Sequence, residues 1–324
     1  MRNRLVFEIR GRNGFSMKIE RISYQGWANS IQLSNRDVDL VVTAAVGPRV
    51  IRFGFRGEEN EFYEAGDQLG LTGGDDWRLY GGHRLWVAPE TRPNTYFADN
   101  FEVKVEDLGE VVRFTPPPET SNRIQKSMDI SLADDGAKVR LTQRVQNIGP
   151  LGVRLAVWGI TAMKAGGVAI LPLPERHEFG HNLQPDCSVS IWNYTDMADP
   201  RFTWGRRFIM LRQDSSIASP QKIGLAATDG WAACARGGHL FIKQFGFDPA
   251  GEYPDRGCNL ETYCDGNLIE LESLGALVTL KPGQAVEYGE TWTLLRGIPQ
   301  PRTEVDVERM ALPEVKIMQN PIIV

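Results

Sequence analysis

Three glutamates gather in residues 259–274, a stretch with the composition of two short strands joined by a turn. The dipeptide Asp265-Gly266 is typical of two-residue hairpin loops. With these two residues as the loop, Glu261 lies directly opposite Glu270, and strand alternation puts Glu272 on the same face. Opposed carboxylates repel unless a cation, a metal or a shared proton lies between them, and one of them then has a raised pKa. The stretch predicts a general acid–base site; the alternative is a solvated edge hairpin whose glutamates contact water or arginines.

A second run with chemical capacity is residues 80–90, Tyr-Gly-Gly-His-Arg-Leu-Trp-Val-Ala-Pro-Glu. Its histidine, His83, can donate a proton, Arg84 can anchor an anion or a hydroxyl group, and Trp86 offers an apolar platform. In a regular strand His83 and Arg84 face opposite ways, so both reach one cleft only through a loop or bulge after Gly82. We expect this run to form one wall of a carbohydrate site with His83 turned into the cleft. The alternative is a hydrogen-bonded structural histidine.

Four more side chains are candidates for holding a sugar. Trp158 can stack on the apolar face of a pyranose, although core packing is an equal alternative. Arg49 can clamp a carboxylate, sulfate or phosphate, or it can neutralise the glutamates. His239 and Lys243 lie on one face of a predicted strand, and a lysine that points inward beside carboxylates is a candidate site residue.

One motif suggests a metal but lacks the context that a metal site needs. Residues 177–181 read His-Glu-Phe-Gly-His, the spacing of zinc proteases. That chemistry needs a helix, whereas prolines at 172, 174 and 185 bracket the run and Gly180 weakens any helix. We therefore interpret the match as a coincidence and predict no cofactor. The clustered glutamates leave Ca²⁺ as the alternative, because this cation prefers oxygen ligands.

The elements that must position these residues are predicted to be strands. Short alternating or apolar runs recur along the chain, with Gly, Pro, Asn and Asp between them and little helical periodicity, which favours an all-β sandwich or barrel. We expect an N-terminal extension (1–16), one domain (17–300) and a C-terminal tail (301–324). The tail contains a predicted short helix, 303–310, and the proline-rich segment 172–220 is predicted to be a long loop.

Composition excludes several classes of protein. A net charge of -5 gives no reason to expect nucleic acid or an anionic membrane as partner, and no run of eighteen apolar residues occurs. The four cysteines form no C-x-x-C pair, which indicates reduced thiols and a cytoplasmic protein. Glu8 and Arg10 interrupt the first apolar stretch too early for a secretory signal.

Five short motifs together resemble the galactose mutarotase-like superfamily, which includes the aldose 1-epimerases. The likeness extends over about residues 25 to 296. The five motifs are an early hairpin (Gly47–Ile51), a Gly-Gly loop (Gly81–Pro89), an asparagine-led turn (Asn147–Pro150), a late strand with a glutamate (Leu271–Ser273) and a closing strand (Glu290–Leu294).

The resemblance implies a β-supersandwich with a sugar, free or within an oligosaccharide, bound on the concave face of a large antiparallel sheet. In these epimerases a glutamate takes the proton of the anomeric hydroxyl and a histidine protonates the ring oxygen, so the ring opens and recloses as the other anomer. Glu272 matches the position of the base best, and Glu270 is its near rival.

One departure from the resemblance concerns the acid. The family's histidine follows the asparagine-led turn, where this chain has Trp158 instead. If the activity is present, the resemblance leaves His83, His239 or Lys243 as the acid. We therefore expect an aldose 1-epimerase-like isomerase. One alternative is a non-catalytic sugar-binding sensor. The other is a lyase or glycoside hydrolase on the same scaffold, and two carboxyl groups roughly 5–5.5 Å apart would serve a retaining mechanism.

Overall fold

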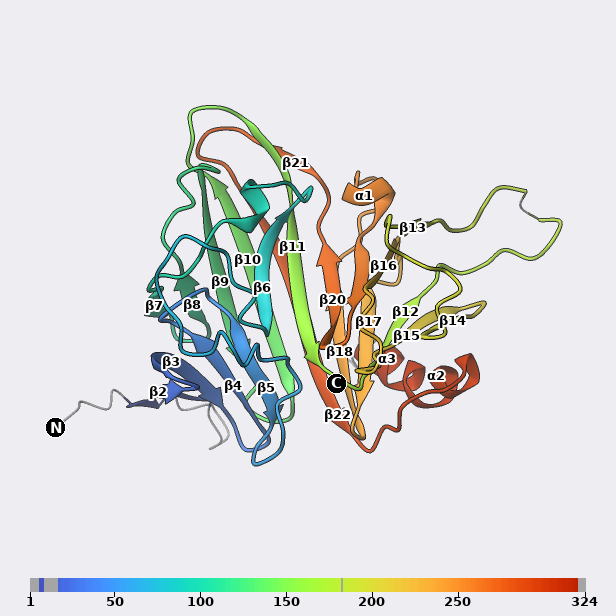
Figure 1. Ribbon diagram of the computed structural model, residues 1–324, viewed down its shortest axis with the longest axis horizontal. Helices are drawn as coiled ribbons and strands as arrows, with labels where there is room; N and C mark the ends of the chain where they lie inside the picture. Colours follow the sequence, from blue (N-terminus) through green and yellow to red (C-terminus); the bar gives the residue numbers. More distant parts are fainter. Residues whose placement is uncertain (1–5, 9–16, 182, 320–324) are drawn as a thin grey trace.

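Two large antiparallel sheets make up most of the structure (Figure 1). The computed structural model describes residues 6–8, 17–181 and 183–319. In spatial order, the twelve-stranded sheet contains β1 (Val6–Glu8), β2 (Lys18–Tyr24), β3 (Trp27–Ser34), β4 (Val38–Thr43), β5 (Val50–Phe55), β6 (His83–Ala88), β11 (Val153–Lys164), β20 (Leu268–Leu274), β19 (Leu260–Cys264), β16 (Gln221–Leu225) and β13 (Val189–Ile191), with β21 (Val278–Leu280) paired to β11.

The ten-stranded sheet faces it. In spatial order it contains β14 (Phe202–Trp204), β15 (Phe208–Arg212), β12 (Val168–Pro172), β17 (Trp231–Arg236), β18 (His239–Phe245), β22 (Ala285–Arg296), β10 (Lys138–Asn147), β9 (Ile124–Leu132), β8 (Val112–Thr115) and β7 (Lys104–Asp107). The short helices are η1 (Asn94–Tyr96), α1 (Pro254–Gly257), α2 (Glu304–Met310) and α3 (Leu312–Gln319). The predicted all-β class is confirmed.

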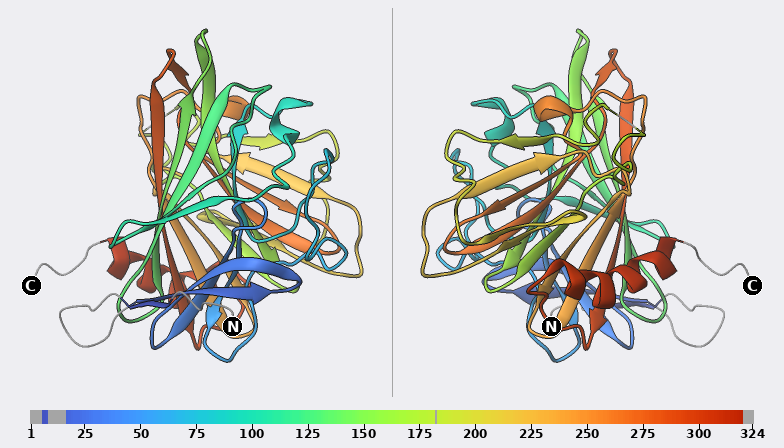
Figure 2. Two further views of the ribbon diagram at one scale, coloured as in Figure 1. Left: turned by 90° about the vertical axis from the view of Figure 1, so that its left-hand side faces the viewer. Right: turned by 90° about the vertical axis from the view of Figure 1, so that its right-hand side faces the viewer.

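Strand alternation places the main core between the sheets. In β12, Ala169 and Leu171 belong to the core between the sheets, whereas Val168 and Ile170 face the other way into a smaller cluster. Val307 of α2 belongs to that smaller cluster, so the two C-terminal helices cover the outer face of the ten-stranded sheet (Figure 1, Figure 2). A sheet that is covered on both faces reads as a continuous apolar run rather than as an alternating one.

The C-terminal segment is packed as far as it is described. The predicted helix 303–310 is α2, and Thr303 begins it with a capping box in which Thr303 and Asp306 bond each other's backbone amides. Pro313 lies in the first turn of α3, where a proline is tolerated. Residues 320–324 lie outside the described range, as does most of the predicted extension 1–16; its residues 6–8 form β1, which pairs with β2.

The predicted loop 172–220 is only partly a loop, because β13, β14 and β15 lie within it. Its His-Glu-Phe-Gly-His run forms a turn with exposed side chains rather than a helix, so the zinc-protease geometry is absent from it. No helix in the described part of the chain is long and apolar enough to cross a membrane.

Candidate active site

Adjacent strands of the twelve-stranded sheet place the glutamates on its outer face. Glu261 of β19 lies directly opposite Glu272 of β20, and Ile160 of β11 separates Glu272 from Arg84 of β6. Directly opposed residues of an antiparallel pair project from the same face. One row across four strands therefore carries two carboxylates and a guanidinium, with Glu270 in the neighbouring row opposite Tyr263.

The predicted pairing of this hairpin is wrong by two residues. Cys264 pairs with Ile269, so residues 265–267 form a three-residue loop between β19 and β20, and Glu261 opposes Glu272 instead of Glu270. The Asp265 carboxylate accepts hydrogen bonds from the amides of Asn267 and Leu268, and Gly266 does not adopt the positive φ that a type I′ hairpin turn requires. Because a shift of two residues preserves strand alternation, all three glutamates still face the same side.

A cleft of about 380 Å³ lies over these rows. Aromatic side chains form much of its wall, and carboxylates, an ammonium group and two guanidinium groups line the rest. The lining residues include Trp77, Arg84, Trp86, Arg92, Tyr96, Trp158, Tyr194, Lys222, Tyr263, Glu270 and Glu272. A cleft that combines aromatic walls with convergent polar groups is a usual form of a small-molecule site.

Glu272 receives two donors on one carboxylate oxygen. Its Oε2 accepts a hydrogen bond from Trp158 Nε1 at 3.1 Å and another from Lys222 Nζ at 2.8 Å. Its Oε1 is buried and has no hydrogen-bond partner among the described residues. Burial raises the pKa of Glu272 and the charge of Glu270 raises it further, while Lys222 acts in the opposite direction. This arrangement holds a carboxylate in place and leaves one oxygen for a proton.

Lys222 is the cation that contacts Glu261 and Glu272, and it was not predicted from the sequence. It lies on β16 opposite Tyr263, and its Nζ is 4.9 Å from the centroid of the Trp158 ring. Burial disfavours its charge, but the carboxylates of Glu272 and Glu261 outweigh that effect and raise its pKa. It therefore remains an ammonium group and supplies the positive charge that opposed glutamates need.

Arg84 and Trp86 lie in the cleft as predicted for an anchor and a platform. Arg84 Nη1 donates to Glu270 Oε1 at 2.9 Å, and its guanidinium lies 4.5 Å from the centroid of the Trp86 ring. Trp86 also packs edge-on against Trp158, at 5.5 Å between ring centroids. Both predicted tryptophans thus line the cleft and pack against each other.

His83 does not turn into the cleft, so that prediction is wrong. β6 is regular from its first residue, and His83 faces the space between the sheets, where it contacts Thr161 and Gln143 and packs on Trp292. No bulge follows Gly82, whose positive φ instead lets the chain approach Val50 so closely that a Cβ there would lie 2.2 Å from its carbonyl oxygen.

Lys243 and His239 also lie away from the cleft, contrary to the expectation that one of them supplies the acid. Lys243 is fully buried between the sheets, 3.4 Å from Glu290, and donates to the Gly159 carbonyl oxygen. His239 lies at a sheet end, where it contacts Glu61. Both residues project inward from the ten-stranded sheet, whereas the cleft lies on the outer face of the other sheet, so strand alternation excludes them.

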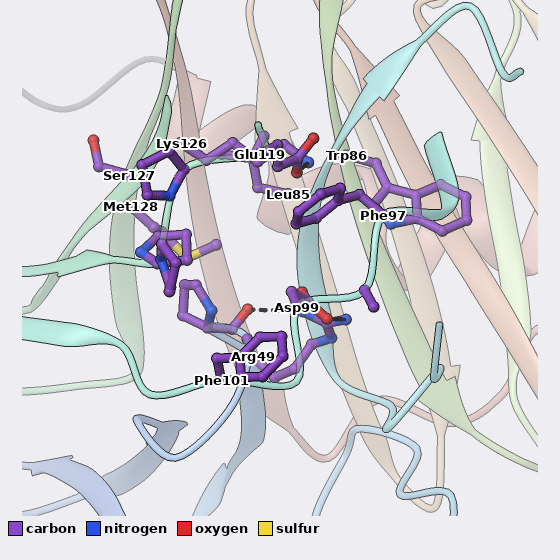
Figure 3. Close-up of a pocket in the computed structure, with 16 residues that line it drawn as sticks. Arg49, Leu85, Trp86, Phe97, Asp99, Phe101, Glu119, Lys126, Ser127 and Met128 are labelled. Carbon is purple, nitrogen blue, oxygen red and sulfur yellow. Dashed lines mark hydrogen bonds and ion pairs between the residues drawn. The ribbon is translucent and has the colours of Figure 1, made fainter. Parts of the chain in front are cut away.

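Arg49 lines a separate hollow of about 170 Å³, shown in Figure 3. Its guanidinium pairs with Asp99, with Nη2 3.0 Å from Oδ1, on one side of a mostly apolar space that Phe101 and Met128 also line. Trp86 borders both this hollow and the cleft. Arg49 therefore neutralises Asp99 rather than the glutamates.

Several cleft residues have no local sequence pattern that would identify them. Lys222 belongs to a short apolar strand. Tyr194 and Trp77 come from irregular segments and Tyr96 from the short helix η1, and all three reach the cleft only in the folded chain. Tyr263 shares its strand face with Glu261, and that alternation was the one signal that could have identified it.

The alternative of bound Ca²⁺ finds no support in the donor set. Among the described residues no group of three or more His, Cys, Asp or Glu side chains is placed to hold a metal ion. The ammonium of Lys222 lies between the carboxylates of Glu261 and Glu272, 2.8 Å from each, which is the place that a bridging cation would take.

Comparison with solved structures shows which fold this is. A galactose mutarotase-like protein from Lactobacillus casei aligns with a TM-score of 0.52 and 13% identity, over 82% of this chain and 100% of that chain. A putative mutarotase from Salmonella typhimurium aligns with a TM-score of 0.52 and 10% identity, over 90% and 97%. A TPR-domain containing protein from Parabacteroides distasonis gives 0.57 and 11%, over 91% of this chain and 52% of that one, so the chain spans about half of its length. No protein-family model and no curated protein matches the sequence. The chain therefore has the galactose mutarotase-like fold.

Proposed function

We propose that this chain binds a sugar in the cleft and interconverts its anomers by proton transfer, with Glu272 as the base. The observation that carries the proposal is the environment of Glu272. One of its oxygens is held by Trp158 and Lys222, the other has no partner, and the aromatic wall of the cleft suits the apolar face of a pyranose. The mutarotase-like fold supports the choice of a sugar as ligand.

The reaction requires one base and one acid. Glu272 Oε1 takes the proton of the anomeric hydroxyl, the C1–O5 bond breaks, and the ring oxygen takes a proton as C1 becomes a carbonyl. Since His83, His239 and Lys243 all lie outside the cleft, we assign the acid to Lys222, the ammonium group that contacts Glu272. Rotation about C1–C2 and the reverse transfers give the other anomer.

The test is exchange NMR between the anomers of a panel of neutral aldoses, comparing wild type with Glu272→Gln. Loss of a positioned general base lowers the rate by about 10²–10⁴-fold, whereas binding of the sugar to Glu272→Gln should persist. Glu287→Gln is the matched control, because Glu287 is an exposed glutamate on β22 of the other sheet. Equal rates for wild type and Glu272→Gln would remove Glu272 from the mechanism.

A second candidate is sugar binding without turnover. It is favoured by the side chains that line the cleft, among which the described residues include no histidine. In that case a sugar would bind wild type, Glu272→Gln and Lys222→Met, and none of the three proteins would accelerate anomer exchange. Titration calorimetry alongside the exchange measurement separates the two functions.

A further inference from the structure

Glu261 is a fully buried carboxyl group directly beside the proposed base. It lies between Glu272 on one neighbouring strand and Gly224 on the other. Gly224 leaves space for it, because a Cβ at position 224 would lie 3.0 Å from Glu261 Cγ and 2.7 Å from Cys258 Sγ. A glutamate is thus enclosed where water does not reach, and the sugar-binding cleft begins at its neighbour Glu272.

The hydrogen-bond donors around this pair are too few for two carboxylates. Lys222 Nζ lies 2.8 Å from Oε2 of each glutamate, but the geometry of a hydrogen bond is met only toward Glu272. Both oxygens of Glu261 and Oε1 of Glu272 are buried without a hydrogen-bond partner among the described residues. One ammonium beside two carboxylates also leaves an excess negative charge, and Asp255 adds to it from the adjacent segment. Buried charge without a partner is strongly disfavoured.

We propose that Glu261 and Glu272 bind a single proton between them, which Glu261 holds while Glu272 faces the cleft as a carboxylate. The two hydrogen bonds to Glu272 Oε2 assign the charge to Glu272, since Trp158 and Lys222 both stabilise the ionised form. The proton on Glu261 removes the excess negative charge and leaves Glu272 Oε1 available to the sugar. This inference rests on the proposed function and makes Glu261 a positioning residue that acts through Glu272.

The electrostatics agree with the geometry. Burial raises the pKa of Glu261 well above its usual range, and the charges of Glu272 and Asp255 raise it further, whereas Lys222 opposes them. Of the two groups, Glu261 is the one enclosed away from the cleft, and it has the ion pair with Lys222 but no second donor among the described residues, whereas Glu272 also accepts from Trp158. A coupled pair of this kind releases its protons in two separate steps that belong to the pair.

The proton can be observed without any sugar, by following the carboxyl carbons of ¹³C-glutamate-labelled protein by NMR from pH 5 to pH 9. We expect wild type to keep one buried glutamate carboxyl protonated at pH 7. Glu261→Gln and Glu272→Gln should each lose that signal, because the remaining carboxylate then has Lys222 to itself and ionises. Lys222→Met should instead show two protonated carboxyls, since no ammonium remains to compensate either charge.

Glu119→Gln is the matched control, because Glu119 is also buried and paired with a lysine, Lys126, away from the cleft. It should leave the signal unchanged. The inference is overturned if wild type shows no protonated glutamate at pH 7, or if the signal survives in Glu272→Gln. These readouts do not involve turnover, so they stand or fall separately from the anomer-exchange test of the proposed function.

Kinetics then test the role of Glu261. Gln at position 261 imitates the protonated carboxyl group, so Glu261→Gln should keep anomer exchange within about tenfold of wild type at pH 7, whereas Glu272→Gln loses far more. Wild-type kcat/KM should change at alkaline pH as the pair loses its shared proton, and Glu261→Gln should lack that change. The same alkaline transition in both proteins would refute the role.

Discussion

His83 provides a sharp test of how the core is built, because burial between the sheets disfavours its protonated, charged form. Burial lowers the pKa of His83 from 6.5 to about 3, so the imidazole is neutral in the folded protein at pH 5. In the unfolded chain His83 takes up a proton near pH 6.5, whereas in the folded protein it does so only near pH 3. Stability linked to His83 is therefore fully present above pH 6.5 and is lost as the pH falls from 6.5 toward 3.

The size of this effect follows from the two pKa values. Each pH unit between them costs about 1.4 kcal/mol, and about 1.5 units separate 6.5 from pH 5, so His83 should remove about 2 kcal/mol of unfolding free energy between pH 7 and pH 5. The perturbation is His83→Gln, which keeps a donor and an acceptor for Thr161 and Gln143 but cannot titrate.

The assay is urea denaturation of both proteins at pH 7 and pH 5. The quantity compared is the loss of unfolding free energy between pH 7 and pH 5, whatever the stability of His83→Gln at pH 7. This loss should be smaller by about 2 kcal/mol in the variant than in wild type. His177→Gln serves as control, because that histidine lies in an exposed turn. Equal losses in wild type and His83→Gln would refute a neutral, buried His83.

Three further predictions concern single contacts. Trp158→Phe keeps an aromatic ring, smaller than the indole, but removes the donor to Glu272. Because a hydrogen bond to a charged group contributes about 1.5–3 kcal/mol, anomer exchange should fall by about 10–100-fold, whereas Trp204→Phe, at an exposed tryptophan, should leave it unchanged. Lys243→Met leaves Glu290 charged between the sheets and should cost about 3–5 kcal/mol in urea denaturation, and adding Glu290→Gln should recover part of that loss; a double variant no more stable than Lys243→Met would contradict this pairing. Gly82→Ala puts a Cβ 2.2 Å from the Val50 carbonyl oxygen at a position with positive φ. It should lower the melting temperature clearly more than Gly57→Ala, because Gly57 also has a positive φ but open space around it. Equal decreases in melting temperature would argue against the close approach.

The fold class and the faces of the hairpin were predictable from the sequence because both depend on local patterns. Alternating apolar runs with turn residues between them indicated strands, and alternation alone put Glu261, Glu270 and Glu272 on one face. The pairing was not predictable from Asp265-Gly266, because the Asp265 side chain capped a longer loop instead. The error of two residues preserved the face and changed only which glutamates meet.

The electrostatic partners of the glutamates could not be predicted from the sequence. Lys222 is some forty residues from Glu261 along the chain and meets the glutamates only because β16 pairs with β19. His83 and Lys243 have side chains that can act as acids. Each lies on the strand face that packs between the two sheets, so both are in the core.

The 80–90 run shows the division most clearly. The sequence by itself determined that a histidine, an arginine and a tryptophan follow two glycines, and that in a regular strand Arg84 and Trp86 share one face while His83 lies on the other. Only the tertiary structure decided which side is cleft and which is core: Arg84 and Trp86 face the glutamates, and His83 faces the opposite sheet. The physical reason is that alternation is fixed within a strand, whereas the layer that each face contacts depends on how both sheets pack.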